Sequence, residues 1–462
     1  MKNETCCPDI KALAVDLPED IEKKKWFGDF KGAIHLIDLW LTRDIPETLR
    51  DKLVLEKEIL QILPHQYTMN YTQALAALRE KIPDFAEEEF ADLKDHGKID
   101  WIYVYGEEKY FESFVSTLLL ENPALKKRAE KTDPSLGKPD PEEELLSDII
   151  HQIKEKQTLS YYFQIKASVR ISDDVFQPGH VIVHMPVPCL SKQVKEMKLV
   201  STSSPDYVLA DETAPQRTIC YEENMTENHP FSVTYEYVNH VDYVDVDVNK
   251  VKPINPDEFE DELSEKLPHI RFTPYMKSLA EKLTAGITNP YLKAKSIYDY
   301  ITTKVEYSYV RNYSTIENLS EYAAIGHKGD CGIQSLMFIT LCRLAGIPAK
   351  WQSGLYTTPY SAGMHDWAQF YIAPYGWLFA DCSFGGSAYM DHDEEKRQFY
   401  FGNIDPFRMP ANSDIQENFT PGKKYLRADT CDNQRGEIEY DDRGLRSYEF
   451  RAGYEVKEAR PL

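Results

Sequence analysis

The chain has 462 residues, enough for about three domains, and its 42% hydrophobic and 28% charged residues are typical of a soluble globular protein. No apolar run approaches the ~18 residues that a membrane-spanning helix needs, so we expect no membrane span. With 53 Lys+Arg against 76 Asp+Glu, the net charge is −23. Such a surface repels phosphate backbones and anionic membranes, so we expect no nucleic-acid or lipid partner.

The N-terminal sequence and the cysteine pattern indicate the cellular compartment in which the protein is expected. The stretch MKNETCCPDIKALAVDLPED has no basic segment followed by an apolar core, which predicts a cytoplasmic protein, or a secreted one if the N-terminus is truncated. The eight cysteines are scattered and form no CxxC pair, which argues against a zinc site and a disulfide scaffold. We therefore expect reduced thiols, no metal and no cofactor.

Helical patterns dominate the first part of the chain, and residues 1–130 are predicted to form an α-helical domain. Apolar residues fall on one helical face in AIHLIDLWL (33–41) and in YTQALAALREKI (71–82), where Asn70 stands at the N-cap position. The stretch GEEKYFESFVSTLLLENP (106–123) predicts a further helix that ends at Pro123. An ordinary helical core is favoured over a partner-binding or substrate-positioning module. The Pro-rich, charged segment 130–144 is a predicted linker.

After a helix through LLSDIIHQIKEK (145–156), the apolar residues recur at every second position. In YFQIKASVRI (162–171) apolar and polar residues alternate, as in a half-buried strand, and HVIVHMPVP and FSVTYEYVNHVDYVDVDV continue the pattern. The pattern predicts a sandwich-like β domain over residues 145–250. A second acidic, Pro-containing linker follows.

Helices return in the third region, residues 270–410. Asn289 caps a predicted helix that has Pro290 at its first position. A second, apolar helix follows Asp330 and ends at Gly346. Strands are expected in MHDWAQFYIAPYGWLFADCSF (364–384), and residues 411–462 are a polar C-terminal extension with short strand-like pieces. The predicted fold class is therefore α+β.

Cys331 stands in the first turn of the apolar helix in HKGDCGIQSLMFITLCRLAGIPAK. Free backbone N–H groups and the helix dipole at that position favour a thiolate and can stabilise an oxyanion. We therefore predict that Cys331 is a nucleophile of low pKa that faces a cleft. Cys342 and Cys382 are expected to be shielded, and nothing near Cys6 or Cys7 lowers their pKa.

A nucleophile of this kind needs a base and a group that orients the base. His365 and Asp381 lie on successive predicted strands and are 16 residues apart, so a hairpin centred at Ala373 would place them opposite each other on one face. The turn signal PYG is centred at Tyr375, which requires a bulge or an asymmetric loop. Asp381 follows the apolar WLFA and therefore needs a buried partner.

Two other groups of residues are weaker candidates. His327, four residues before Cys331, is a rival base without a carboxylate partner in an apolar strand. A cluster of acidic residues lacks the ligand spacing of a known calcium loop and is expected to be a solvated loop: Asp391, Asp393, Glu394 and Glu395.

The stretches GDCGIQSLMFITLCRLAGIPAK, HDWAQFY and GWLFADCS together resemble the core of the transglutaminase-like superfamily, including bacterial members. The resemblance covers residues 286–390 strongly and 158–286 more weakly, and it maps the family's catalytic Cys, His and Asp onto Cys331, His365 and Asp381. It implies a papain-like fold, in which a helix carrying the thiol packs on an antiparallel sheet carrying His and Asp. Residue 366 is Asp where a small residue is commoner, and Trp351-Gln352 is also unusual, so both sites are expected to reshape the acyl pocket. Tyr307 and Tyr309 are candidates for completing the oxyanion hole.

The resemblance implies a cysteine enzyme that attacks an amide carbonyl of a peptide or protein through a thioester on Cys331. In this mechanism His365 protonates the leaving amine and Asp381 holds the imidazole. Hydrolysis by a cysteine protease-like activity is favoured over transfer to an amine. The alternatives are a non-catalytic interaction scaffold on the same fold and a peptide:N-glycanase-type amidase, although the cysteine-pair zinc site usual in that branch is missing.

Overall fold

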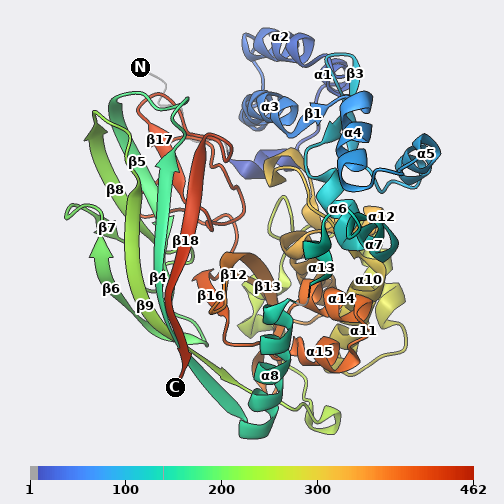
Figure 1. Ribbon diagram of the computed structural model, residues 1–462, viewed down its shortest axis with the longest axis vertical. Helices are drawn as coiled ribbons and strands as arrows, with labels where there is room; N and C mark the ends of the chain where they lie inside the picture. Colours follow the sequence, from blue (N-terminus) through green and yellow to red (C-terminus); the bar gives the residue numbers. More distant parts are fainter. Residues whose placement is uncertain (1–8, 139) are drawn as a thin grey trace.

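The computed structural model describes residues 9–138 and 140–462 and shows an antiparallel β-sandwich beside two helical regions (Figure 1). The N-terminal helices lie at one end, and the helices of the third region lie below them, packed on a central sheet (Figure 1). Within the described residues, every helix is too short or too polar to cross a bilayer.

The N-terminal region is helical as expected, but it also contains a small sheet. Asn70 caps its helix as predicted, because its side chain accepts a hydrogen bond from the backbone N–H of Gln73 at 3.0 Å. The helices are α1 (Glu19–Trp26), α2 (Phe30–Leu41), α3 (Glu47–Gln66), α4 (Tyr71–Lys81), α5 (Glu87–Asp95), α6 (Phe114–Glu121) and α7 (Pro123–Ala129). The sheet has the order β1-β3-β2 and comprises β1 (Tyr67–Met69), β2 (Trp101–Val104) and β3 (Glu107–Phe111).

The expected helix over 106–123 is therefore wrong in its first half. Tyr105 and Gly106 both have positive φ angles, 52° and 82°, and form the two-residue turn of a hairpin that makes Glu107–Phe111 a strand. Turn chemistry at two residues overrides the helical propensity of the glutamates that follow.

The β-sandwich is present, and both of its sheets include strands from the end of the chain. One sheet has the order β18-β4-β9-β6 and the other β17-β5-β8-β7. The strands are β4 (Thr158–Ile171), β5 (Gly179–Pro186), β6 (Val194–Thr202), β7 (Val208–Leu209), β8 (Thr218–Met225), β9 (Phe231–Asp242), β17 (Glu437–Tyr440) and β18 (Phe450–Pro461). The helix α8 (Pro141–Lys156) packs its apolar residues into the same core.

The C-terminal extension is thus not a separate appendage. β18 pairs antiparallel with β4 from Phe450 opposite Ile171 to Pro461 opposite Tyr161. It is an edge strand of 12 residues with a largely exposed face, so its sequence carries little apolar alternation and predicted only short pieces.

The third region packs helices on one face of a five-stranded sheet with the order β15-β14-β13-β12-β16. The helices are α9 (Glu260–Leu263), α10 (Pro274–Thr284), α11 (Pro290–Lys304), α12 (Leu319–Gly326), α13 (Cys331–Leu344), α14 (Cys382–Met390) and α15 (Glu394–Phe399). The strands are β12 (Ala349–Thr357), β13 (Ala362–Ile372), β14 (Gly376–Ala380), β15 (Phe401–Gly402) and β16 (Arg408–Asn412). A separate parallel pair joins β10 (Glu306–Tyr307) to β11 (Lys328–Gly329).

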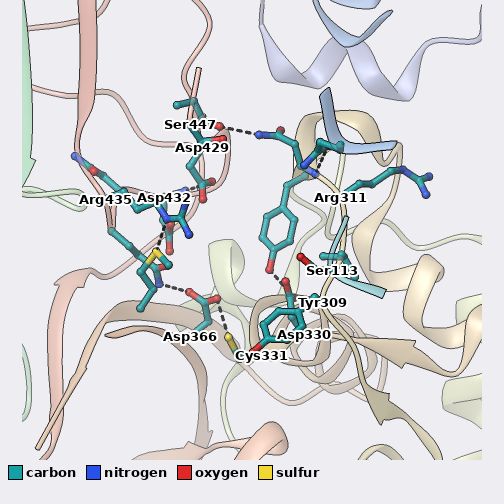
Figure 2. Close-up of a pocket in the computed structure, with 18 of the residues that line it drawn as sticks. Ser113, Tyr309, Arg311, Asp330, Cys331, Asp366, Asp429, Asp432, Arg435 and Ser447 are labelled. Atoms are coloured by element: carbon teal, nitrogen blue, oxygen red, sulfur yellow. Dashed lines mark hydrogen bonds between the residues drawn. The ribbon is translucent and has the colours of Figure 1, made fainter. Parts of the chain in front are cut away.

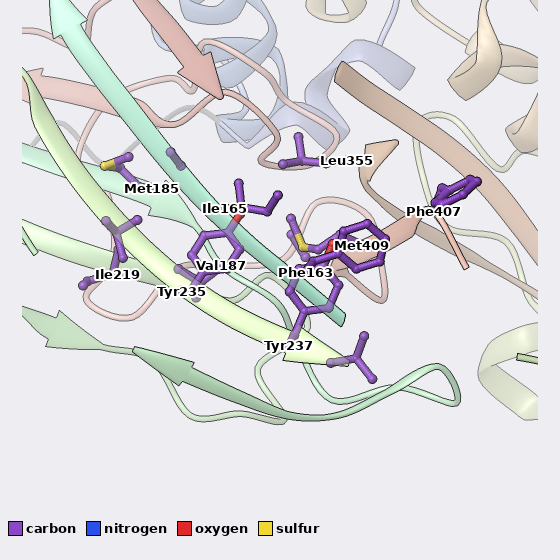
Figure 3. Packing of buried hydrophobic residues seen from close by; sticks show 14 of the residues in the cluster. Phe163, Ile165, Met185, Val187, Ile219, Tyr235, Tyr237, Leu355, Phe407 and Met409 are labelled. Carbon is purple, nitrogen blue, oxygen red and sulfur yellow. The ribbon is translucent and has the colours of Figure 1, made fainter. Parts of the chain in front are cut away.

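Alternation along β13 divides its residues between two cores. Ala368, Phe370 and Ile372 face the buried helix α13, whereas Trp367 joins the core of the sandwich. Figure 3 shows this second core, in which Phe163 and Tyr237 of the sandwich lie near Phe407 and Met409 of the third region. The β domain and the third region therefore share one hydrophobic core.

The N-terminal region has its own hydrophobic clusters and meets the rest of the chain mainly through polar contacts. Asn312 donates its backbone N–H to Gln66 Oε1 at 2.9 Å, and Lys328 Nζ donates to the carbonyl of Gly97 at 2.9 Å. Leu426, from the C-terminal extension, packs into the cluster of α2 and α3.

We expect limited trypsin digestion to cut first after Lys131, which is exposed in the predicted linker. Both products should stay folded, because the apolar clusters on either side are largely independent. Mass spectrometry of the nicked protein and a melting curve of each separated fragment would check this. Loss of all cooperative melting after the first cut would mean that the two parts need each other to fold.

Candidate active site

Cys331 occupies the predicted position at the start of α13. Asp330 caps this helix by accepting a hydrogen bond from the backbone N–H of Ile333 at 3.1 Å, and Tyr313 donates its hydroxyl to the same carboxylate at 2.6 Å. Among the cysteines of the described residues, Cys331 is half-buried and the other five are buried. Cys342 and Cys382 are thus shielded as expected, while Cys6 and Cys7 lie outside the described residues.

A cavity of about 480 Å³ opens beside Cys331, where three parts of the chain meet (Figure 2). The N-terminal region contributes residues near Ser113, the third region contributes residues 307–313 with Asp330, Cys331 and Asp366, and the C-terminal extension contributes residues 428–436. Tyr307 and Tyr309 both line it. Of the unusual residues, Asp366 lines the cavity, whereas Trp351 and Gln352 do not appear among its lining residues in the described chain.

The thiol of Cys331 is paired with a carboxylate. Cys331 Sγ donates to Asp366 Oδ2 at 3.3 Å, and Figure 2 shows the two side chains pointing toward each other. Gln434 donates its side-chain N–H to the other oxygen, Oδ1, at 2.5 Å. The buried Asp432 lines the same cavity and accepts the hydroxyl of Ser353. Residues 432–434 of the C-terminal extension therefore complete the site.

Burial and crowded carboxyls set the electrostatics of this cavity. Burial, with Asp432 and Asp330 as negative neighbours, raises the pKa of Asp366 well above its usual range. Burial together with Asp429 raises the pKa of Asp432 to about 7, and burial raises the pKa of Asp330 to about 6. These carboxyl groups therefore hold protons at a pH where exposed carboxyl groups are ionised.

The expected low pKa of Cys331 is contradicted. Burial of the sulfur raises the pKa of the Cys331 thiol well above its ordinary value, and the negative charges of Asp366 and Asp330 raise it further. The helix N-terminus favours a thiolate as predicted, but the desolvation and the neighbouring carboxylates oppose it more strongly.

His365 and Asp381 do form the expected contact. His365 Nε2 lies 2.8 Å from Asp381 Oδ2, and both residues are buried. Asp381 also caps α14 by accepting the backbone N–H of Phe384 at 3.0 Å. A third partner was not predicted: Arg408 on β16 is fully buried and donates to Asp381 Oδ2 at 2.8 Å. Although burial alone would raise it, the charges of His365 and Arg408 hold the pKa of Asp381 below its usual range.

Within the described chain, no hydrogen bond joins the thiol of Cys331 to the imidazole of His365, and their partnership in a reaction stays a prediction. Neighbouring residues of a strand point to opposite faces of a sheet, and Asp366 faces α13 with Cys331. His365 therefore faces the sandwich side, where it packs against Phe384 and Trp367 with ring centroids 4.9 and 5.9 Å away.

The hairpin register also differs from the expected one. Ala368 pairs with Ala380 and Ile372 with Gly376, so the centre of the hairpin is Pro374 rather than Ala373. Continuing that register places Asp381 opposite Trp367, and His365 reaches it diagonally on the same face. The sequence does indicate which face of β13 packs on α13. Ala368, Phe370 and Ile372 are all apolar, so their face is the one expected to pack on the helix.

The weaker candidates have other roles. His327 is exposed and ends α12 in a left-handed conformation. In the acidic cluster, Asp393 caps α15, Glu394 accepts hydrogen bonds from Arg397, and Glu395 pairs with Lys154. Over residues 9–138 and 140–462, no group of three or more His, Cys, Asp or Glu side chains is arranged to hold a metal ion.

Comparison with known proteins supports the resemblance over part of the chain. Residues 277–382 match the model of the transglutaminase-like superfamily, a segment that contains Cys331, His365 and Asp381. No curated protein matches the chain. A solved structure of a putative cysteine protease from Cytophaga hutchinsonii shares 15% identity, covers 66% of this chain and 91% of its own, and has a TM-score of 0.41. The periplasmic domain of TgpA from Pseudomonas aeruginosa shares 12% identity, covers 54% and 96%, and has a TM-score of 0.29.

Proposed function

We propose that this chain, whose residues 277–382 form a transglutaminase-like core, is a cysteine-dependent amide hydrolase that acts on a peptide or protein. The observation that supports it best is the placement of Cys331. Of the cysteines in the described residues, Cys331 alone is half-buried rather than buried, and it lies at a cavity and begins a helix.

The reaction forms a thioester on Cys331 with release of an amine, and water then hydrolyses the thioester. Backbone N–H groups of the first turn of α13 are suited to stabilise the oxyanion of the tetrahedral intermediate. The cavity of about 480 Å³ has the size of a site for a small molecule or a few peptide residues. Hydrolysis is favoured over transfer to a second amine.

One observation favours a second function, a non-catalytic interaction scaffold on the same fold. Within the described residues no hydrogen bond joins the Cys331 thiol to the His365 imidazole, which is bonded to Asp381 and packs against Phe384.

The two functions are separated by incubating the protein with a peptide library and identifying the products by mass. A hydrolase yields cleaved or deamidated peptides, and Cys331→Ser should lower the rate at least about a thousandfold, because the nucleophile is lost. His327→Asn, at an exposed histidine away from the cavity, is the matched control and should keep the wild-type rate. Products formed equally by Cys331→Ser would exclude the thioester, and a folded protein that turns over no peptide would favour the scaffold.

A further inference from the structure

We infer that Asp366 binds the α-ammonium group of a peptide's first residue, so that Cys331 attacks the carbonyl of that residue and the protein removes single amino acids from peptide N-termini. This inference rests on the proposed function and deepens it, because it names the substrate as a peptide with a free N-terminus. The acid–base role predicted for His365 is left unchanged. Asp366 is also the residue at which the sequence departs from the small side chain that is commoner there.

The first support is the short distance between the carboxylate and the nucleophile. Asp366 Oδ2 lies 3.3 Å from the sulfur of Cys331. In a peptide the α-nitrogen lies about 2.5 Å from the carbonyl carbon of the same residue, because only Cα separates them. When the sulfur contacts that carbon, the α-ammonium group therefore lies close to the sulfur, where Asp366 is. The ammonium group of an extended lysine side chain lies much further out, at the end of a four-carbon stem.

Asp366 is held in position from two sides. Gln434 donates its side-chain N–H to Oδ1 at 2.5 Å, while Oδ2 faces the thiol. Residue 332, which follows the nucleophile, is a glycine, and a Cβ atom there would lie 2.8 Å from Asp366 Oδ2. The first turn of α13 thus leaves room for the carboxylate. A carboxylate that is already fixed binds a cation with little further loss of side-chain entropy.

The second support is the charge of the cavity, which is lined by four carboxyl groups: Asp330, Asp366, Asp429 and Asp432. Among the described residues, no lysine, arginine or histidine forms an ion pair with any of the four, and Arg427, close by in the chain, pairs with Glu437 instead. Two arginines also line the cavity, but Arg435 is exposed and donates to the sulfur of Met364, and Arg311 points away from the carboxyl groups (Figure 2). A buried carboxylate without a cation is costly, so the cavity is suited to a positively charged ligand.

The third support is an unpaired donor that suits the carbonyl group beside the ammonium group. The side chain of Asn433 is 1% exposed and lines the cavity, yet within the described residues its Nδ2 makes no hydrogen bond. Its Oδ1 accepts the backbone N–H of Gly436 at 2.8 Å, so the amide cannot rotate freely. An unpaired buried donor calls for an acceptor from a ligand. The first residue of a peptide supplies both groups, an ammonium for the carboxylates and a carbonyl oxygen for this donor.

Binding of the ammonium group also changes the state of the thiol. In the free protein the thiol donates to Asp366, and burial, together with the negative charge of that carboxylate, holds the pKa of Cys331 above its ordinary value. A bound ammonium group replaces the thiol as the donor to Asp366 and neutralises the charge of the carboxylate, so the pKa of the thiol falls. The nucleophile is therefore activated when a substrate with a free N-terminus is bound.

The reaction needs no reactant other than water. The sulfur of Cys331 bonds to the carbonyl carbon of the first residue, the amide C–N bond breaks, and the leaving nitrogen takes up the proton that the thiol has lost. Water then attacks the thioester, so that its hydroxyl group bonds to the carbonyl carbon and its other proton returns to the sulfur. One peptide and one water give one free amino acid and a peptide that is shorter by one residue.

The test compares one peptide in two forms, with a free and with an acetylated N-terminus, and identifies the products by mass. The wild type should remove single residues from the free form, with kcat/KM at least about 30-fold above that for the acetylated form, as is typical when one partner of a buried charge pair is removed. Asp366→Asn keeps the shape of the side chain and an oxygen for Gln434, and it should abolish this preference. Asp206→Asn, at an exposed carboxylate, is the matched control and should keep the wild-type ratio.

Cleavage at internal bonds with equal kcat/KM for the two forms would overturn the inference and leave the proposed function in place. Equal processing of an acetylated peptide that begins with Lys would also overturn it, because the bound cation would then belong to a side chain. If Asp366→Asn lowers kcat/KM for both forms by the same factor, the residue supports the fold and does not select the substrate. The comparison of the two forms in the wild type decides even if Asp366→Asn does not fold. A wild type that turns over neither form would remove the proposed function and the inference together.

Discussion

Arg408→Met is expected to destabilise the protein by about 3–5 kcal/mol, as is typical when one partner of a buried ion pair is removed. Arg408 is fully buried and donates to Asp381 at 2.8 Å and to Asp405 at 3.1 Å, and both carboxylates are themselves fully buried. Without the guanidinium, the donors left to Asp405 among the described residues are the hydroxyl of Tyr400 and the backbone N–H of Phe407. The midpoint of urea unfolding, followed by circular dichroism, measures the loss.

The pH dependence of this loss has a defined sign. In the wild type the pKa of Asp381 is lowered, so its stabilising contribution is present above about pH 4 and is lost as the pH falls further. In Arg408→Met the unpaired carboxyl groups should instead have raised pKa values, which favour the folded state at acid pH. The difference between the two proteins should therefore shrink toward pH 4.

Arg170→Met is the matched control. Arg170 pairs with Asp173 at 2.7 Å, a similar distance, but both side chains are largely exposed to solvent. Such pairs contribute about 0–1 kcal/mol. An equal loss of stability in Arg408→Met and Arg170→Met would mean that burial does not determine how much the Arg408 ion pairs stabilise the protein.

Much of the fold follows from periodicity. The period of two over Tyr162–Ile171 predicts a strand that the structure extends over Thr158–Ile171, and Asn70, Asn289 and Asp330 all cap helices as their positions indicate. Long-range pairing is harder to predict. Nothing local in the sequence of β18 indicates that it covers β4, some 290 residues earlier in the chain, because pairing partners depend on the assembled core.

The site divides in the same way. A cysteine at the start of a capped helix could be predicted, since Asp330 and Cys331 are adjacent and both effects are local. The contact between His365 and Asp381 could be predicted because the two residues lie on successive strands of a hairpin and are an even number of residues apart, which places them on one face. Packing between distant segments decides which face of the sheet His365 and Asp381 occupy. It also brings the buried Arg408 and the carboxyl groups of residues 429 and 432 to their places, which no local pattern predicts. The one pattern in the sequence that indicates which face of β13 packs on α13 is the apolar set Ala368, Phe370 and Ile372.

Between about pH 4 and pH 7 we expect the wild type to lose stability as the pH rises, and Asp432→Asn to remove much of that loss. Asp432 has a pKa of about 7 and Asp330 of about 6, each raised by burial from an ordinary value of 3.8. A raised pKa in the folded state contributes stability that is fully present below the unfolded value and is lost as the pH rises through the folded value. The window is thus about pH 4–7, and the expected change is a few kcal/mol.

Asp432→Asn keeps the size of the side chain and an oxygen that can accept the hydroxyl of Ser353, but it carries no charge. At pH 8 the variant should be more stable than the wild type, and at about pH 4, where Asp432 is largely protonated in the folded and the unfolded state alike, the two should be similar. Melting temperatures across this range measure both curves, and Asp206→Asn at an exposed position should change neither by more than about 0.5 kcal/mol. If the stability of the wild type does not change from pH 5 to 8, the pKa values of these carboxyl groups are not raised in the folded state. If Asp432→Asn, a change of one atom group at constant size, raises the stability at pH 8, then the crowded carboxyl groups beside Cys331 lower the stability of the folded protein. Proteins keep such destabilising groups at sites of reaction, so the result would indicate that these groups serve a purpose other than folding.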